Sequence, residues 1–273
     1  MTAEMPPAMI LCGGYGTRLR DVTELLPKPL VPIGGQPIVW HIMKSYAAYG
    51  VRRFILCLGY KKEEFIDYFL NYRARRGDIT IRPGGVPEFI TKPSETESDW
   101  QITLADTGLD TMTGGRIRLA SRYLAPGDRD FFMTYGDGVS DVDIAGLLAF
   151  HRRAGRALTI TAVHPEGRFG ELDFDGDRVV RFCEKPPRSP GYVNGGFMVL
   201  RRDAIERFIP EKDCFFEQSP ILDAVAAGEV AAFRHEGFWQ CMDTPREHKM
   251  LSDLWLSGSA PWRRAWGDGD ALR

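Results

Sequence analysis

The stretch MILCGGYGTRLRDVTELLPKP, residues 9–29, predicts how the rest of the chain is arranged. It begins with a four-residue apolar run that stops at Gly13-Gly14, which favours a buried strand feeding a tight turn. The turn contains a third glycine, Gly16, and residues without a Cβ atom let the backbone approach a ligand closely. Successive N–H groups in such a turn can form a nest for an anion. The stretch therefore predicts a phosphate-binding turn at the end of a strand.

Cations follow the glycines, but their spacing fits neither common phosphate-binding fingerprint. No Lys-Ser/Thr pair follows the turn, and Leu19 occupies the position of the third glycine of the dinucleotide-binding pattern. Arg18 can hold phosphate oxygens through two parallel hydrogen bonds. Lys28 lies between Pro27 and Pro29, so we expect it to project from a stiff, extended segment. The alternative is an ordinary strand–turn–helix with surface cations.

Composition limits the classes of function. A chain of 273 residues with 44% apolar and 26% charged residues is typical of a soluble globular protein with one large α/β domain or two small ones. A net charge of −2 gives no general attraction to nucleic acid or to a membrane surface. Five cysteines without a C-x-x-C pair argue against a disulfide framework or a zinc site. We find no signal peptide and no membrane span, so we expect a cytoplasmic protein.

The order of the elements predicts a parallel sheet with helices on its faces. A strand at 9–12, a helix at 37–49, a strand at 54–58 and a helix at 61–75 alternate. The segment 83–99 reads as a loop. A hairpin turn at 175–177 predicts that the sheet becomes mixed in the second half. We expect further strands at 101–105, 131–135, 158–163, 170–174, 178–183, 192–200 and 230–235, and helices at about 116–123, 142–153, 203–208, 216–227 and 245–256.

Two aspartates are candidate metal ligands. Asp137 lies between two glycines directly after the strand 131–135, an exposed and stiff position that suits a divalent cation carrying phosphates. A turn aspartate is the alternative. Asp243 precedes Thr244-Pro245 at a helix start, and from spacing alone a helix cap is favoured over a metal ligand. The five histidines have no metal-ligand spacing and read as structural.

Several separated blocks resemble the sugar-nucleotide pyrophosphorylases, and within them the glucose-1-phosphate cytidylyltransferase family. The resemblance runs from about residue 9 to residue 262 and is carried by GGYGTRL, PKPLVPIGGQPIVWHI, MTGGRI, YGDGVSD, GRFGELD, EKP, VNGGFMVL and GFWQCMDTPRE. It implies an α/β, Rossmann-like nucleotidyltransferase fold with a mixed, mostly parallel central sheet flanked by helices. The expected single domain, 1–273, has a nucleotide-binding half at 9–135, a sugar-phosphate-binding half at 136–256 and a tail at 257–273.

The resemblance also implies a role for each matched residue. Catalysis would rest on Arg18, Lys28 and Asp137, and Mg²⁺ would be bound by Asp137 and Asp243, which reverses the preference for a cap. Sugar-phosphate binding would fall to Glu184, Lys185, Asn194 and Gly195. The implied nucleotide-binding residues are Leu11, Cys12, Gly13, Gly14, Tyr15, Gly16, Thr17, Arg18, Lys28, Thr111, Arg116 and Gly136.

The expected reaction is Mg²⁺-dependent transfer of CMP from CTP to a sugar 1-phosphate, most simply glucose 1-phosphate, giving CDP-glucose and pyrophosphate. The resemblance further implies a homo-oligomer, with a hexamer expected by analogy. The same fold acting on another nucleotide or on another sugar, such as a heptose phosphate, is one alternative. A non-catalytic regulator that binds sugar nucleotides is another, although a pure sensor has less need of all four of Arg18, Lys28, Asp137 and Asp243.

Overall fold

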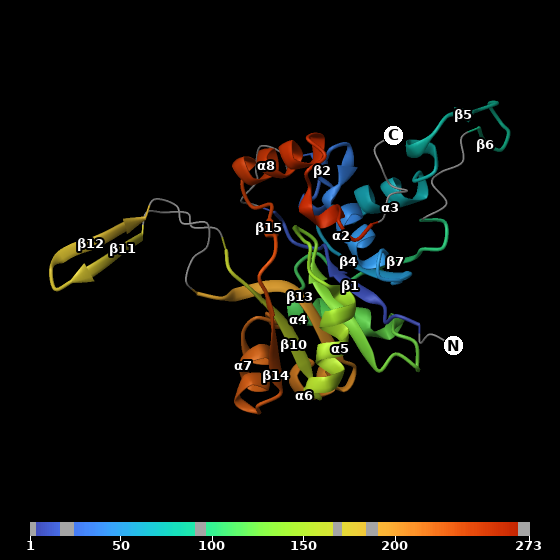
Figure 1. Cartoon of the computed structure of the whole chain (residues 1–273). Coiled ribbons are helices and arrows are strands. Elements are labelled where there is room, and N and C mark those ends of the chain that lie inside the picture. Colours follow the sequence, from blue (N-terminus) through green and yellow to red (C-terminus); the bar gives the residue numbers. More distant parts are fainter. Residues whose placement is uncertain (1–3, 17–24, 91–96, 166–170, 184–190, 267–273) are drawn as a thin grey trace.

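The computed structural model describes residues 4–16, 25–90, 97–165, 171–183 and 191–266. A seven-stranded sheet with the order β14-β10-β13-β8-β1-β4-β7 forms its centre (Figure 1). Neighbouring strands pair in parallel, except that β13 runs antiparallel to both β8 and β10. This confirms the predicted mixed, mostly parallel sheet. Its strands are β1 (Ala8–Leu11), β4 (Arg53–Leu58), β7 (Gln101–Asp106), β8 (Asp130–Tyr135), β10 (Leu158–Val163), β13 (Val193–Arg201) and β14 (Val230–His235).

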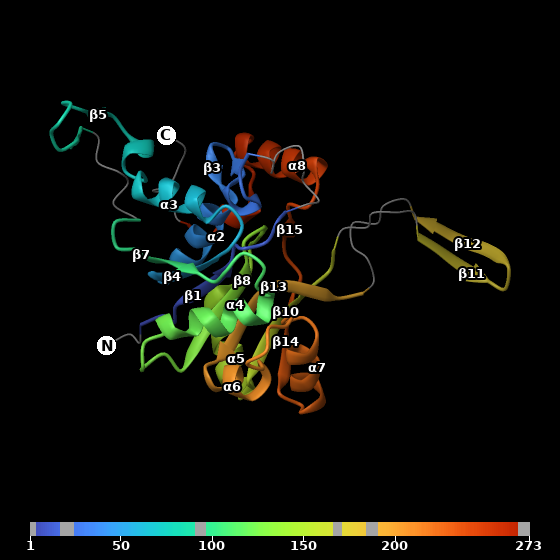
Figure 2. The same cartoon turned by 180° about the vertical axis from the view of Figure 1, so that it is seen from behind.

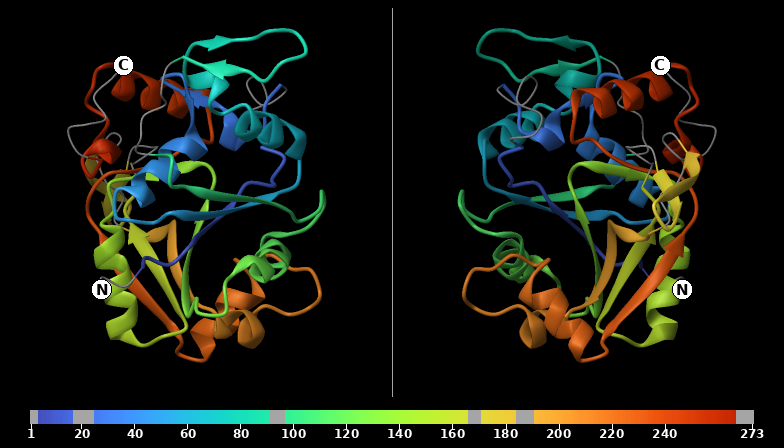
Figure 3. Two further views of the ribbon diagram at one scale, coloured as in Figure 1. Left: turned by 90° about the vertical axis from the view of Figure 1, so that its right-hand side faces the viewer. Right: turned by 90° about the vertical axis from the view of Figure 1, so that its left-hand side faces the viewer.

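Alternate residues of β1 pack into two different core layers. Ala8 and Ile10 belong to a cluster with residues of α2, α5 and α8, whereas Met9 and Leu11 pack with residues of α4 and α6. Both faces of a parallel sheet are usually covered in this way, and the edge-on views of Figure 3 show α5 and α4 on opposite sides. The helices are α2 (Ile38–Ala47), α3 (Lys62–Leu70), α4 (Thr113–Ala120), α5 (Ile144–Ala154), α6 (Asp203–Phe208), α7 (Ser219–Ala226) and α8 (Pro245–Leu256).

Helix α2 is buried on nearly every side. All nine residues from 38 to 46 are buried. The C-terminal segment contributes to this burial, because the ring centroids of Trp255 and Trp262 lie 4.5 Å and 6.1 Å from that of His41. Burial lowers the pKa of His41 to about 4, so this imidazole is neutral at pH 7.

Three predicted helix boundaries were wrong by several residues. Helix α3 ends at Leu70 rather than at residue 75, and the short 3-10 turn Ala74–Arg76 follows. Helix α7 begins at Ser219 rather than at 216, because the N–H of Phe216 is used by the Thr113 hydroxyl. Helix α4 begins three residues earlier than expected, and the 3-10 turn Ser121–Tyr123 extends it. At α7 a tertiary contact outweighs the hydrophobic pattern.

Small two-stranded pairs lie outside the main sheet. Strand β9 (Gly138–Ser140) pairs with β15 (Trp239–Cys241), and β2 (Pro32–Ile33) pairs with β3 (Gln36–Pro37). The segment predicted as a loop contains the second strand of the pair β5 (Ile79–Thr80) and β6 (Glu88–Phe89). The predicted hairpin, β11 (Glu171–Asp175) with β12 (Arg178–Cys183), stands away from the body in both cartoon views (Figures 1 and 2). Among the described residues, every helix is too short or too polar to cross a membrane.

Candidate active site

The glycine turn lies at the carboxyl end of β1, an interior strand of the sheet. Strand β1 is bordered by β4 and β8, and ligands of α/β sheets bind at this edge. A cavity of about 520 Å³ opens there. It is lined by twelve of the predicted residues: Leu11, Cys12, Gly13, Gly14, Tyr15, Gly16, Lys28, Thr111, Arg116, Gly136, Asp137 and Asp243.

Two of the predicted residues, Asn194 and Gly195, are described but do not line this cavity. Asn194 and Gly195 are on β13, where the Asn194 side chain accepts a hydrogen bond from the Gly196 N–H at 2.9 Å. The predicted residues Thr17, Arg18, Glu184 and Lys185 lie outside the described residues. Their roles stay predictions.

Lys28 joins the two predicted metal ligands across the chain. Its Nζ donates to Asp137 Oδ2 and to Asp243 Oδ1, each at 2.6 Å. The expectation of an extended segment was wrong, because Lys28 begins the 3-10 turn Lys28–Leu30. Proline favours such a position, since its φ angle already matches the first turn of a helix. The turn buries the stem of Lys28 and directs its ammonium group to the cavity.

Neighbouring carboxylates stabilise the positive charge of Lys28. Burial alone would favour the neutral amine, but the nearby carboxylates of Asp137 and Asp243 outweigh burial and raise the pKa of Lys28 above its usual value. The ammonium group therefore stays charged at neutral pH. Only 10% of the Lys28 side chain is exposed, so little water screens it from an anion in the cavity.

Helix α8 places Asp243 without using its carboxylate as a cap. The Thr244 hydroxyl accepts from the Glu247 N–H, and Glu247 Oε2 accepts from the N–H groups of Thr244 and Asp243 at 2.8 and 2.7 Å. This reciprocal capping box satisfies the start of the helix. The helix cap that the spacing favoured is therefore supplied by Thr244, and the Asp243 carboxylate is not the cap but accepts from Lys28.

Asp137 and Asp243 fit a hard divalent cation better than the neighbouring group of Cys241, Asp243 and Glu247 does. Their two carboxylates already converge on one positive group, and Mg²⁺ prefers oxygen ligands. Cys241, Asp243 and Glu247 also lie close enough together to share an ion. However, Glu247 is engaged in the capping box. Burial raises the pKa of Cys241 to about 12, so its thiol is a poor ligand.

Arg116 holds the walls of the cavity together. Its Nη2 donates to the carbonyl oxygens of Gly13 and Leu109 at 3.1 and 3.0 Å, and its Nη1 donates to those of Leu58 and Gly108 and to the Thr107 hydroxyl. A Cβ atom on Gly13 would lie 2.2 Å from this guanidinium group. The predicted nucleotide contact of Arg116 stays a prediction, whereas its bracing of the glycine turn is visible.

The cysteine in the cavity is not a poised nucleophile. Cys12 is 1% exposed, and burial raises the pKa of its thiol well above the usual value. A thiol is a nucleophile only as the thiolate. Beside it, the Tyr15 hydroxyl donates to Asp110 Oδ1 at 2.6 Å and ties the glycine turn to the loop after β7.

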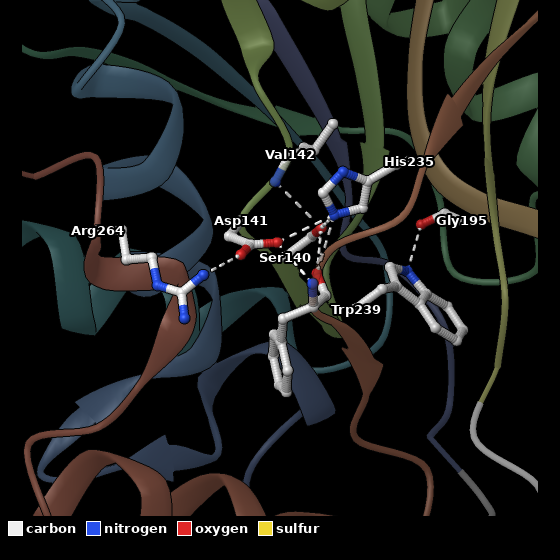
Figure 4. Close-up of polar contacts among 8 residues, drawn as sticks. Ser140, Asp141, Val142, Gly195, His235, Trp239 and Arg264 are labelled. Atoms are coloured by element: carbon white, nitrogen blue, oxygen red, sulfur yellow. Dashed lines mark hydrogen bonds and ion pairs between the residues drawn. The ribbon is translucent and has the colours of Figure 1, made fainter. Parts of the chain in front are cut away.

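Ser140, Asp141 and His235 lie together in Figure 4, but their geometry is not that of a catalytic triad. A single ring nitrogen, His235 Nε2, faces both Asp141 Oδ1 at 3.0 Å and Ser140 Oγ at 3.3 Å. A triad needs one ring nitrogen for each partner. The Ser140 hydroxyl donates instead to the carbonyl of Phe238 at 2.7 Å. The cluster therefore fastens β15 to β9.

Asp141 makes most of the contacts in this cluster. Its carboxylate accepts from the Phe238 N–H at 2.6 Å and from Arg264 Nη1 at 3.1 Å (Figure 4). Burial acts to raise the pKa of Asp141, but the hydrogen bonds from His235 and Phe238 and the charge of Arg264 hold it below its usual value. Next to the cluster, Trp239 donates from its indole nitrogen to the Gly195 carbonyl at 2.7 Å.

Sequence reasoning missed a second set of residues around the cavity. Tyr135 and Phe215 line it, and the Tyr135 hydroxyl donates to Glu217. The position of Tyr135, directly before Gly136-Asp137, was the only available signal. Glu217 lies 82 residues further along the chain, in a stretch assigned to an ordinary helix.

A glycine turn at the carboxyl end of the interior strand β1, with a lysine and two carboxylates at the cavity, is typical of a nucleotide-binding α/β protein. The chain belongs to the nucleotidyl transferase family, whose model matches residues 7–240. It is 43% identical over 256 residues to the glucose-1-phosphate cytidylyltransferase of Salmonella typhi, covering 94% of this chain and 98% of that protein. It is 40% identical over 257 residues to a probable glucose-1-phosphate cytidylyltransferase of Bacillus subtilis, with the same coverage.

A solved structure agrees with the fold. HddC from Yersinia pseudotuberculosis superposes with a TM-score of 0.64 at 25% identity, over 92% of this chain and all of that chain. The sequence-based assignment to the nucleotidyltransferases and the predicted fold class are confirmed. The chain is an enzyme of this family, and its relatives place it with the glucose-1-phosphate cytidylyltransferases.

Proposed function

We propose that this chain transfers CMP from CTP to glucose 1-phosphate and releases pyrophosphate. The observation that carries the proposal is the meeting of Lys28, Asp137 and Asp243 at the cavity that the glycine turn lines. The relatives from Salmonella typhi and Bacillus subtilis are a glucose-1-phosphate cytidylyltransferase and a probable one, which supports CTP and glucose 1-phosphate as the substrates.

The chemistry needs charge neutralisation more than covalent catalysis. A phosphate oxygen of the sugar 1-phosphate attacks the α-phosphorus of CTP, and the bond to the bridging oxygen of the pyrophosphate breaks. The attacking oxygen is already ionised at neutral pH, so no general base is required. This agrees with the buried thiol of Cys12 and with the structural role of His235. The two anionic substrates repel each other unless positive groups lie between them.

Each residue then has a defined part. The N–H groups of the glycine turn bind phosphate oxygens of the nucleotide. Lys28, held by Asp137 and Asp243, lies where it can bridge the reacting phosphates and lower the cost of their approach. Asp137 and Asp243 would hold Mg²⁺, which when bound supplies further positive charge to the phosphates. Arg18 and Lys185 are proposed to bind pyrophosphate and sugar phosphate.

A substrate panel tests the proposal. The full-length protein is incubated with Mg²⁺, glucose 1-phosphate and each of CTP, UTP, dTTP, ATP and GTP, and pyrophosphate release is measured. We expect CTP to give the highest kcat/KM. Replacing glucose 1-phosphate by a heptose 1-phosphate or by mannose 1-phosphate tests the sugar in the same way.

Two results would redirect the proposal. A preference for another nucleotide or sugar would keep the reaction class and change the substrate. CDP-glucose binding without EDTA-sensitive pyrophosphate release would point to the regulator instead. The predicted homo-oligomer is proposed alongside, and sedimentation of the purified chain measures it.

A further inference from the structure

One carboxylate beside the cavity has no part in the reaction as derived so far. Glu217 Oε1 accepts from the Tyr135 hydroxyl at 2.6 Å, and Glu217 Oε2 accepts from the Thr113 hydroxyl at 2.6 Å. The two donors come from the end of β8 and from the start of α4, and both residues line the cavity. The carboxylate is therefore held from two sides at the edge of the site, although the residue itself is exposed.

The charge of Glu217 restricts what it can contact. Within the described part of the chain, no lysine, arginine or histidine forms an ion pair with it; its partners there are the neutral hydroxyls of Tyr135 and Thr113. Such a carboxylate repels phosphate. It suits the neutral part of a substrate, and in a sugar phosphate that part is the ring with its hydroxyl groups.

Tyr135 connects Glu217 to the segment that is proposed to bind the sugar phosphate. The Tyr135 ring covers Gly196, where an added Cβ atom would lie 2.6 Å from a ring carbon. Glu217 and Tyr135 thus form one hydrogen-bonded pair between the cavity and β13. This pair lies near Asp137, where the phosphates are proposed to react.

We propose that Glu217 accepts hydrogen bonds from hydroxyl groups of the sugar and thereby selects the sugar. This inference rests on the proposed function. An ionised carboxylate has about four lone-pair positions, and Tyr135 and Thr113 occupy one on each oxygen. The remaining positions accept O–H donors of the kind that the two side chains already supply. A site built around a substrate hydroxyl discriminates strongly against an analogue that lacks it.

The first test compares two substitutions in the same loop. Glu217→Gln keeps the shape but removes the charge, and we expect kcat/KM for glucose 1-phosphate to fall about 10- to 100-fold because a hydrogen bond to a charged group is lost. The KM for CTP should change less than about twofold. Glu211→Gln is the matched control, since Glu211 is exposed and lies outside the cavity. Tyr135→Phe keeps the ring on Gly196 but removes one hydrogen bond to Glu217. It should lower kcat/KM for glucose 1-phosphate by a smaller factor, again with little change in the KM for CTP.

The second test uses the 2-, 3-, 4- and 6-deoxy analogues of glucose 1-phosphate. With the unaltered protein, at least one analogue should lose about tenfold or more in kcat/KM. With Glu217→Gln, that same analogue should react almost as well as glucose 1-phosphate, because the acceptor is already gone.

A purely structural role gives a different pattern. If Glu217 only braces α4, Glu217→Gln lowers the melting temperature, raises the KM for CTP and glucose 1-phosphate alike, and leaves the losses with the analogues unchanged. That outcome overturns the inference. If Glu217→Gln does not fold, Tyr135→Phe with the same analogues decides the question. Failure of the unaltered protein to make CDP-glucose contradicts the proposed function instead.

Discussion

The two ends of the β9–β15 ribbon carry similar side chains in different situations. Next to Ser140, Asp141 is bonded by a backbone N–H, by His235 and by Arg264. At the other end, Asp137 and Asp243 share the ammonium group of Lys28. A backbone donor cannot leave its acceptor without unfolding, whereas a lysine on a long stem can exchange partners. The type of acidic residue is the same at both ends of the ribbon. The mobility of the donor therefore distinguishes the proposed reactive centre at Lys28 from the structural cluster at Asp141.

The largest effect should follow from removing the shared ammonium group. Lys28→Ala should lower kcat by about 10²-fold or more, the scale seen when preorganised charge stabilisation is lost. Pyrophosphate release with CTP and glucose 1-phosphate measures it. Lys249→Ala is the control, because Lys249 is exposed and pairs with Asp253 on the same helix, α8. Full turnover by Lys28→Ala would show that Lys28 has no role in the reaction.

Arg116→Met should affect the cavity wall rather than the reacting groups. The change removes the Arg116 donor from the carbonyl oxygens of Gly108 and Leu109 and one of the donors from those of Gly13 and Leu58. We therefore expect a loss of about 2–4 kcal/mol in the free energy of unfolding. The KM for CTP should rise more than kcat falls, because the glycine turn loosens. Urea denaturation and steady-state kinetics measure both. An unchanged KM for CTP in a stable protein would mean that the turn does not need this brace.

Asp141→Asn tests the structural end of the ribbon and should have a smaller effect. We expect a loss of about 1 kcal/mol in unfolding free energy at pH 7, with kcat kept within about threefold. The pKa of Asp141 is depressed in the folded state. Its stabilising contribution is therefore present above the unfolded pKa of about 4 and is lost as pH falls through the folded pKa.

Denaturation of Asp141→Asn and of the unaltered protein between pH 7 and pH 3 should thus give stabilities that converge at low pH. A difference in stability that stays constant down to pH 3 would exclude the ionised carboxylate as its source. A kcat reduced as severely as in Lys28→Ala would erase the contrast between the two ends of the ribbon.

The smallest effect should come from Thr244, the N-cap of α8, whose capping leaves the Asp243 carboxylate available to Lys28. Thr244→Ala removes the side-chain acceptor at the start of α8 and should cost about 1 kcal/mol of stability, whereas Thr244→Ser should restore most of it. Thermal denaturation measures this. A cost equal for both substitutions would show that the hydroxyl is not the stabilising group.

Sequence predicted most of the fold because the strands have strong local signals. The run 158–163 was located to the residue, since a largely buried strand reads as nearly continuous apolar sequence. The edge strand 230–235, which is only partly buried, was located to the residue as well. Helix α8 was located equally well through Thr244 and Pro245. The ribbon of β9 and β15 was missed, because three-residue strands that pair across about 100 positions leave no local pattern.

The site was predicted unevenly for a physical reason. Residues that contact a ligand through short motifs, such as Lys28 and Asp137, are recognisable in the sequence. The partners that hold them are not: the carbonyls around Arg116 carry no sequence signal, because any residue supplies a carbonyl. Glu217 meets Tyr135 only through tertiary folding. Asp243 illustrates both cases, since the cap at Thr244 was readable and the contact to Lys28 was not.

Dependence on Mg²⁺ tests the central claim most directly. Pyrophosphate release from CTP and glucose 1-phosphate is measured over a Mg²⁺ titration for the unaltered protein and for Asp137→Asn. The account predicts that turnover of the unaltered protein is abolished by EDTA, and that Asp137→Asn loses about 10²-fold in kcat and needs more Mg²⁺ to reach its half-maximal rate. Equal turnover and an identical Mg²⁺ dependence in the two proteins would contradict it.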